Sequence, residues 1–191
     1  PKSFMDANGD GIGDLRGVTE KLDYIHELGA NVVWLNPIYK NSGVDGGYDI
    51  SDYALVDPKF GSKESPAAKS NGGAVSEATA MADYESLLSA AHSRGMKVIM
   101  DLVLNHTSTA NNWFVSSANL DDEYRGFYQW GNHETDEGHI NQDNYWYPYG
   151  DHAYSYYAKF GSGMPELNYS YSATREAVIC LLYTSPSPRD R

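Results

Sequence analysis

The fold of this chain is decided by the stretch Lys97-Val98-Ile99-Met100-Asp101-Leu102-Val103-Leu104-Asn105-His106. It begins as a buried-strand pattern and breaks into the polar pair Asn105-His106. Residues 81–94, which precede it, have the pattern of a helix, and Gly95 is a helix stop signal. In an α/β barrel, polar side chains at the carboxyl end of a strand lie on the functional face. The stretch therefore predicts a barrel strand that delivers side chains to a site.

The residues nearer the N-terminus predict an earlier step of the same architecture. Residues 15–28 carry apolar side chains at helical spacing, and Gly29 closes this predicted helix. Its apolar positions are Leu15, Val18, Leu22, Ile25 and Leu28. Residues 31–35 form a short β-branched run that ends at Asn36-Pro37, which is typical of a strand. Helix, strand, helix and strand in this order indicate a parallel α/β architecture.

The hexapeptide Asp101-Leu102-Val103-Leu104-Asn105-His106 resembles the first signature region of the α-amylase superfamily, glycoside hydrolase family 13, whose form is Asp-x-x-x-Asn-His. Four further stretches agree with that family in order and spacing, and the resemblance covers nearly everything up to Ile179. Five ordered matches are far more specific than one short motif. The four stretches are Asp6-Ala7-Asn8-Gly9-Asp10-Gly11-Ile12-Gly13-Asp14, Asn31-Val32-Val33-Trp34-Leu35-Asn36-Pro37, Gly47-Tyr48-Asp49-Ile50-Ser51-Asp52-Tyr53 and Met164-Pro165-Glu166-Leu167-Asn168.

The resemblance implies a partial (β/α)8 TIM barrel, with about strands 2 and 3 and helices 1 to 3, and a domain B inserted after strand 3. The expected order is residues 1–106 for the N-terminal part of the barrel, 107–168 for domain B and 169–179 for the start of the third barrel helix. Residues 107–163 keep no helical or strand period, yet they are too aromatic to be disordered. At 191 residues the chain is shorter than the roughly 250 of a complete barrel, so we expect a fragment.

Two segments depart from the family pattern. Residues 62–80 are rich in Ala, Ser and Gly, so we expect a mobile surface insertion before the helix of residues 81–94. Residues 180–191 resemble the translation of a sequencing adapter, and we interpret them as an artefactual tail. Their Ser185-Pro186-Ser187-Pro188 run should end the helix that residues 173–179 begin.

The composition limits the kind of partner. A formal net charge of −12 without clustered Lys or Arg excludes a nucleic-acid binder, and no apolar run approaches the roughly 18 residues of a membrane span. Aromatic residues make up 13% of the chain and crowd between Trp113 and Phe160. Some of them pack a core, but aromatic side chains also bind the apolar C–H faces of sugar rings. We therefore expect a monomer with an α-glucan or oligosaccharide partner, and no intramolecular disulfide because Cys180 is the only cysteine.

The loop Asp6-x-Asn8-x-Asp10-Gly11-Ile12-x-Asp14 places side-chain oxygens at alternate positions, which suits a hard cation such as Ca2+. Its twelfth position is Gly17 and not Glu, so a true EF-hand is disfavoured. The alternative is a solvated loop of Asx turns without a metal. The resemblance implies a Ca2+ cofactor held by Asp6, Asn8, Asp10, the Ile12 carbonyl and Asp14.

The resemblance also implies a substrate-binding set, Tyr48, Asp49, Asp101 and His106. In the family, His106 would hydrogen-bond the sugar at the cleavage point, Tyr48 would stack on that sugar, and Asp49 would bind its hydroxyl groups in exo-acting relatives. Asp101 supports the architecture around the catalytic carboxylate, and Asn105 is a candidate ligand of a second, interdomain Ca2+. From the residues alone, the same side chains also fit a strand-end cap, a structural histidine, a loop aromatic and a turn former.

The catalytic carboxylates of the family are not found in this sequence. Retaining hydrolysis needs two carboxyl groups about 5 to 5.5 Å apart. The family's nucleophilic Asp sits in a Gly-x-Arg-x-Asp context, which does not occur here, so we assign no catalytic residue and expect the 191-residue chain to be inactive. The resemblance places α-amylase, which hydrolyses α-1,4-glucosidic bonds, ahead of α-glucosidase, oligo-1,6-glucosidase or trehalose synthase.

Two alternatives belong to other functional classes. One is a non-catalytic, amylase-like protein that binds a partner, although such relatives have lost signature residues that this chain keeps at Tyr48, Asp101, Asn105 and His106. The other is a Ca2+-stabilised sugar-binding protein without hydrolysis. The family expectation favours an extracellular or periplasmic location, and a cytoplasmic one also fits.

Overall fold

The computed structural model describes residues 1–132, 145–150 and 154–184, which form two compact units. Unit 1 contains Pro1–Lys40 and Tyr53–Leu102, and unit 2 contains Asn41–Asp52 and Val103–Thr184. Strands β2 (Tyr39–Asn41) and β3 (Ile50–Val56) form a separate two-stranded sheet through which the boundary runs. The boundary therefore falls after Leu102, earlier than the predicted boundary after His106, and it assigns residues 41–52 to the second unit.

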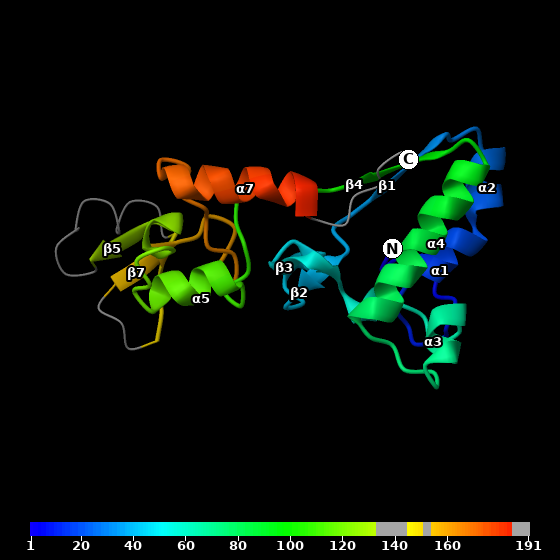
Figure 1. The fold of residues 1–191 in the computed structure, drawn as a ribbon, viewed down its shortest axis with the longest axis horizontal. Coiled ribbons are helices and arrows are strands. Elements are labelled where there is room, and N and C mark those ends of the chain that lie inside the picture. Colours follow the sequence, from blue (N-terminus) through cyan, green and yellow to red (C-terminus); the bar gives the residue numbers. More distant parts are fainter. Residues whose placement is uncertain (133–144, 151–153, 185–191) are drawn as a thin grey trace. The chain divides into compact units, whose positions relative to one another are not determined.

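Unit 1 consists of short helices and one pair of parallel strands (Figure 1). Its elements are α1 (Leu15–Glu20), α2 (Leu22–Glu27), β1 (Val32–Leu35), the 3-10 helix η2 (Pro58–Phe60), α3 (Pro66–Ser70), α4 (Glu77–Ser93) and β4 (Lys97–Met100). Strands β1 and β4 pair in parallel, with Val33 opposite Val98 and Leu35 opposite Met100. Helix α4 lies between the two strands in sequence and packs against α1. This arrangement confirms the predicted parallel α/β class.

The two faces of the β1 and β4 pair differ in burial. Leu35 and Val98 belong to the buried core of unit 1, together with side chains from α1 and α4. Because side chains alternate along a strand, Trp34 and Ile99 lie on the opposite face, where they are 69% and 48% exposed. In a closed barrel, an apolar face of this kind fills the interior, as the partial-barrel interpretation requires.

The predicted helix of residues 15–28 is divided into α1 and α2 at Lys21. Lys21 has φ −100° and ψ 5°, and its N–H donates to the Val18 carbonyl oxygen at 3.1 Å. This i to i−3 bond tightens the turn and interrupts the α-helical pattern. The apolar spacing continues across the break, since Leu15, Val18 and Leu22 are all buried. The apolar spacing is therefore confirmed at these three positions, whereas Leu28 is 69% exposed and the single continuous helix is wrong.

Residues 62–80, predicted to be a mobile surface insertion, contain regular structure instead. The Ser65 hydroxyl caps α3 by accepting from the Ala68 N–H at 3.1 Å, and Ala68 is fully buried. Ser76 and Thr79 form a capping box at the start of α4. Serines that look like linker residues in the sequence act as helix caps here, so α4 begins before Met81.

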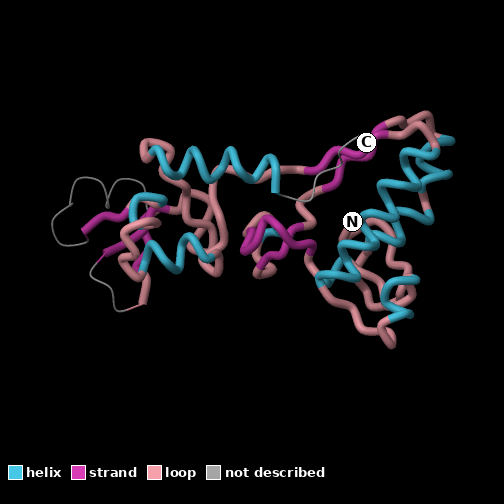
Figure 2. The backbone as a smooth tube through the Cα atoms, viewed as in Figure 1, coloured by secondary structure: helices cyan, strands magenta, loops and turns pink. Residues whose placement is uncertain are grey.

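Unit 2 combines a three-stranded antiparallel sheet, in the order β5-β7-β6, with two helices (Figure 2). Its elements are the 3-10 helices η1 (Asp45–Gly47) and η3 (Arg125–Phe127), helices α5 (Asn112–Ala118) and α7 (Ser172–Thr184), and strands β5 (Trp130–Asn132), β6 (Trp146–Pro148) and β7 (Tyr154–Tyr157). The ring of Phe114 forms the centre of the core. It lies 4.9 to 5.5 Å from the rings of Tyr128, Trp130, Tyr149 and Tyr156. The strands have only three or four residues each, which is why the sequence showed no period.

Helix α7 continues through Cys180 to Thr184, so part of the expected artefactual tail is helical. The helix packs against η3 and groups with unit 2. The run Ser185-Pro186-Ser187-Pro188 lies outside the described residues, and the adapter origin of residues 180–191 stays a prediction. None of the helices described here combines the length and apolar character that crossing a membrane requires.

We predict that Gly17→Ala destabilises unit 1. A Cβ atom at this position would lie 2.1 Å from the Met5 carbonyl oxygen, which also accepts the Asp14 N–H at 2.9 Å, so the backbone would have to shift. Urea denaturation should show a loss of about 1–3 kcal/mol in the free energy of unfolding. The control Ser86→Ala, on the exposed side of α4, should change it by less than about 0.5 kcal/mol. Equal urea midpoints for Gly17→Ala and Ser86→Ala would contradict the close packing of Gly17 against the Met5 carbonyl.

Candidate sugar-binding site

Backbone hydrogen bonds within unit 2 join three of the sequence motifs, those that contain Tyr48, His106 and Leu167. The Ser108 N–H donates to the Ile50 carbonyl oxygen at 2.8 Å, which joins the segment after Tyr48 to the segment that follows β4. The Leu167 N–H donates to the Asn105 carbonyl oxygen at 2.9 Å. The structure therefore brings together motifs that are far apart in the sequence.

His106 lies at the centre of this convergence and is only 5% exposed. Its Nε2 atom is 3.1 Å from the Tyr48 carbonyl oxygen, and because a carbonyl only accepts, Nε2 carries a proton and donates it. The Asn105 Nδ2 atom donates to Nδ1 at 3.3 Å, which requires a neutral ring. Burial lowers the pKa of His106, against the raising effects of the Tyr48 bond and of nearby carboxylates, Glu166 first among them. His106 is therefore a neutral, oriented imidazole.

Phe160 covers one side of that imidazole. The two ring centroids are 5.4 Å apart and the planes are inclined by 39°. Phe160 is itself 59% exposed, and it precedes Gly161, whose φ of 121° suits glycine. The sequence analysis gave Phe160 no role, although its place just before the Met164 motif was a usable signal. The structure adds it to the site.

Tyr48 and Asp49 lie beside His106 in the same unit. Asp49 is 0% exposed, and its Oδ2 atom accepts from the Ser42 N–H at 2.9 Å. The Ser42 and Ser108 hydroxyl oxygens are 2.8 Å apart, which links this turn to the segment of His106. Tyr48 is half-buried and supplies the carbonyl that orients His106. Three of the four predicted substrate-binding residues thus form one cluster.

The fourth residue, Asp101, belongs to unit 1. Its N–H donates to the Leu35 carbonyl oxygen at 3.1 Å and extends the parallel strand pairing beyond β4. Asn105 belongs to unit 2, is exposed, and orients His106. The support that Asp101 would give to a catalytic carboxylate and the second Ca2+ on Asn105 stay predictions.

The acidic loop (residues 6–14) in unit 1 is organised around two carboxylates. The Asp6 carboxylate accepts four backbone N–H groups at 2.6 to 3.3 Å, and these bonds, led by that of Gly11, lower its pKa. Asp14 is fully buried, and its side chain caps α1. Burial raises the pKa of Asp14. Asp10 is exposed and accepts only a local turn bond, from the N–H two residues on, at 2.8 Å.

The donor atoms of the acidic loop fit a hard cation. The Asn8 Oδ1 atom is buried and has no hydrogen-bond partner among the described residues, which leaves an acceptor available to a ligand. Carboxylate and amide oxygens are the ligands that Ca2+ takes in proteins. Within the described parts of the chain, no group of three or more His, Cys, Asp or Glu side chains is placed to hold a metal ion. A cation here would therefore need mixed ligands, with Asn8 and the Ile12 carbonyl beside the carboxylates.

The family model for the α-amylase catalytic domain matches residues 1–70 and 77–183 of this chain. The unmatched internal residues, 71–76, fall between α3 and α4. They lie within the predicted insertion of residues 62–80 and occupy only part of it.

Three similar proteins illustrate the relationship. Oligo-1,6-glucosidase from Bacillus cereus is 40% identical over 185 residues, which cover 93% of this chain and 30% of the relative. Trehalose-6-phosphate hydrolase from Escherichia coli (strain K12) is 42% identical over 130 residues, 68% of this chain and 20% of the relative. A crystal structure of a mutant trehalose-6-phosphate hydrolase from Bacillus licheniformis superposes with a TM-score of 0.79 at 37% identity, over 96% of this chain and 31% of that one. The chain thus spans about 30% or less of the length of these relatives.

We predict that Phe160→Ala raises the pKa of His106. Burial is the main cause of its lowered pKa, and removal of the Phe160 ring admits water, which favours the charged imidazolium. An NMR titration of the His106 ring should show the pKa moving toward about 6.5. The control Phe4→Ala, which removes an exposed ring from unit 1, should leave it unchanged. If the pKa of His106 does not rise in Phe160→Ala, the packing of Phe160 on the His106 ring is contradicted.

Proposed function

This chain belongs to the α-amylase family of glycoside hydrolases, and on that premise we propose that the protein containing it is an exo-acting α-glucosidase. Its substrates would be short α-linked oligosaccharides, with α-1,6 bonds as in isomaltose. The segment present here would supply the sugar-binding side of the site. The nucleophile and the acid would come from parts of the protein beyond this segment, because retaining hydrolysis needs two carboxyl groups that we do not find here.

The cluster of Tyr48, Asp49 and His106 is the observation that carries the proposal. The one N–H of a neutral His106 donates to the Tyr48 carbonyl oxygen, so a sugar hydroxyl would accept it in place of that carbonyl. The buried Asp49 carboxylate accepts from the Ser42 N–H through Oδ2, so it would accept a sugar hydroxyl only once the site opens toward it. The rings of Tyr48 and Phe160 can pack against the C–H face of the same sugar. Such a set suits one glucose unit.

The choice of α-glucosidase over α-amylase rests on the relatives. The sequence motifs placed α-amylase first, but oligo-1,6-glucosidase is among the similar proteins at 40% identity. The similarity to trehalose-6-phosphate hydrolases supports a second candidate, an exo-acting hydrolase of a phosphorylated disaccharide. Both candidates use one terminal glucose unit, so the assay below separates them by substrate.

We also propose that the acidic loop binds one Ca2+ ion. The proposal is supported by the buried, unpartnered Oδ1 of Asn8 and by an all-oxygen donor set. Asp6, Asn8, Asp10, the Ile12 carbonyl and Asp14 would hold the ion. Bound charge would offset the cost of burying Asp14 and would fasten the loop to the start of α1.

If the loop binds Ca2+, Asp10→Ala should lower the melting temperature in Ca2+ by several degrees and make it insensitive to chelator. The matched control is Asp121→Ala, because Asp121 is also exposed and accepts from the N–H two residues on, at 3.1 Å. The control should keep the full difference between Ca2+ and chelator, measured by differential scanning calorimetry. A wild-type chain with the same melting temperature in both conditions would refute the calcium proposal.

The intact protein should release glucose from isomaltose without reducing the viscosity of starch, as chromatography of the products would show. His106→Ala should lower kcat/KM by about 100-fold or more, as removal of an oriented donor does. The control Tyr24→Ala, exposed on α2, should keep full activity. The 191-residue chain alone should be inactive. Rapid internal cleavage of starch, or cleavage of trehalose 6-phosphate only, would contradict the α-1,6 assignment.

A further inference from the structure

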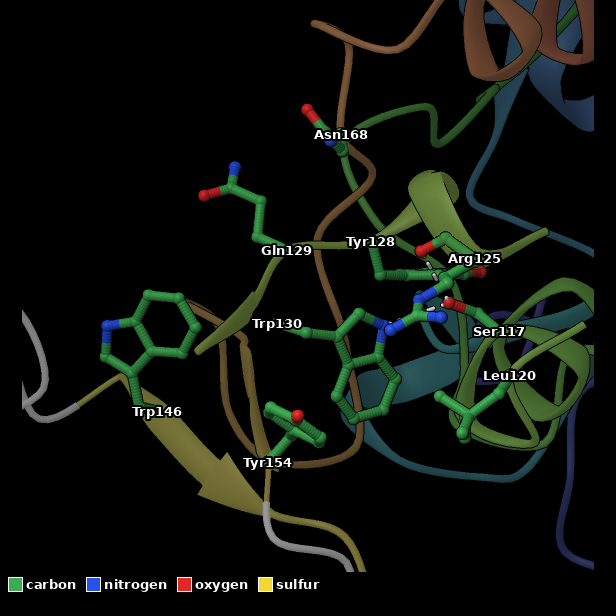
Figure 3. A pocket seen from close by; sticks show the side chains of 10 residues that line it. Ser117, Leu120, Arg125, Tyr128, Gln129, Trp130, Trp146, Tyr154 and Asn168 are labelled. Atoms are coloured by element: carbon green, nitrogen blue, oxygen red, sulfur yellow. Dashed lines mark hydrogen bonds between the residues drawn. The ribbon is translucent and has the colours of Figure 1, made fainter. Parts of the chain in front are cut away.

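A cavity lies within unit 2, between the end of α5, η3 and the β5 edge of the sheet (Figure 3). Its volume is about 580 Å³, which is in the range of small-molecule sites. Its lining includes none of Tyr48, Asp49, His106 and Phe160. The cavity is therefore distinct from the candidate sugar-binding site.

Trp130 forms the fixed centre of this cavity. Its indole Nε1–H donates to the Ser117 hydroxyl oxygen at 2.9 Å, as the dashed line in Figure 3 shows. Its ring stacks on Phe114 with centroids 5.5 Å apart and planes inclined by 20°. Because one side of the ring is held by the core, its orientation does not depend on a ligand.

Trp146 and Tyr154 supply two more aromatic surfaces. The ring of Trp146 lies close over Gly131, where an added Cβ atom would come within 3.0 Å of it. The ring also packs on Tyr157 at 5.3 Å. Tyr154 is 43% exposed. In the view of Figure 3, Trp130 lies between Trp146 and the side chain of Leu120, with Tyr154 below it.

Two polar side chains of the cavity, Arg125 and Gln129, are available to a ligand. Arg125 and Gln129 are exposed, and their side chains make no hydrogen bond or ion pair in the part of the chain that the structure describes. Among the described residues that line the cavity, none is Asp or Glu. Residues 121–123, Asp-Asp-Glu, lie just before Tyr124 and η3 and would repel an anion, although Arg125 alone would attract one. These charges favour a neutral ligand rich in hydroxyl groups.

We infer that this cavity is a second saccharide-binding site, which takes a neutral α-glucoside oligosaccharide outside the reaction centre. Aromatic rings would pack on the C–H faces of the sugar, and Arg125 and Gln129 would hydrogen-bond its hydroxyl groups. The saccharide class rests on the cavity itself, whereas the α-glucoside linkage rests on the proposed function.

The test is a calorimetric titration of the chain with isomaltotriose and with maltotriose. Wild type should show two binding events, and His106→Ala should remove one of them. Gly131→Ala should weaken the other by about ten-fold, because the new methyl group displaces Trp146 without removing an aromatic ring. Tyr154→Ala should weaken it similarly, and its control Tyr24→Ala, at an exposed tyrosine of unit 1, should not.

Gln129→Ala removes an exposed side chain that makes no hydrogen bond or ion pair among the described residues. It therefore still tests the site if one of the other variants fails to fold. It should weaken the same event and leave the near-ultraviolet circular dichroism unchanged. A single binding event that disappears in His106→Ala would overturn the second site and leave the proposed function standing. Two events that are unaffected by Gly131→Ala, Tyr154→Ala and Gln129→Ala would also overturn it. If the intact protein hydrolyses no α-glucoside but these variants weaken binding as described, the proposed function fails and the second site stands.

Discussion

The backbone pairing between residues 105–107 and 165–167 is the interaction on which unit 2 depends. The Leu167 N–H donates to Asn105, and the Thr107 N–H donates to Pro165 at 3.1 Å. These bonds close the long excursion that follows β4, and closing a loop of that length costs chain entropy. The aromatic core around Phe114 offsets this cost, because burying large rings against one another is strongly favourable.

The same pairing places the groups that a sugar would meet. It sets Phe160 against His106, and the bond from Ser108 to Ile50 brings the Tyr48 turn to the other side of the imidazole. His106 is therefore positioned by contacts from two segments that are distant in sequence, together with its neighbour Asn105. A site built in this way has its orientation fixed by the fold before any ligand binds, which reduces the ordering cost of binding.

The sequence predicted those features that have a local signal. Strand β4, the buried face shared by α1 and α2, and the polar break at Asn105-His106 follow from short periods and a strand end. Phe160 was missed because its contact with His106 depends on nonlocal antiparallel pairing, which leaves no period in the sequence. The helical structure within residues 62–80 was not predicted, because serine is typical of linkers. Here Ser65 and Ser76 cap α3 and α4 instead.

The most direct test of this account is a crystal structure of the intact protein with glucose bound. The account predicts one glucose in van der Waals contact with the rings of Tyr48 and Phe160 and within hydrogen-bonding distance of His106. A glucose bound at the reaction centre without contact to these three side chains would contradict it. In that case, the cluster around His106 would only stabilise the fold of unit 2 and would not be its sugar-binding site.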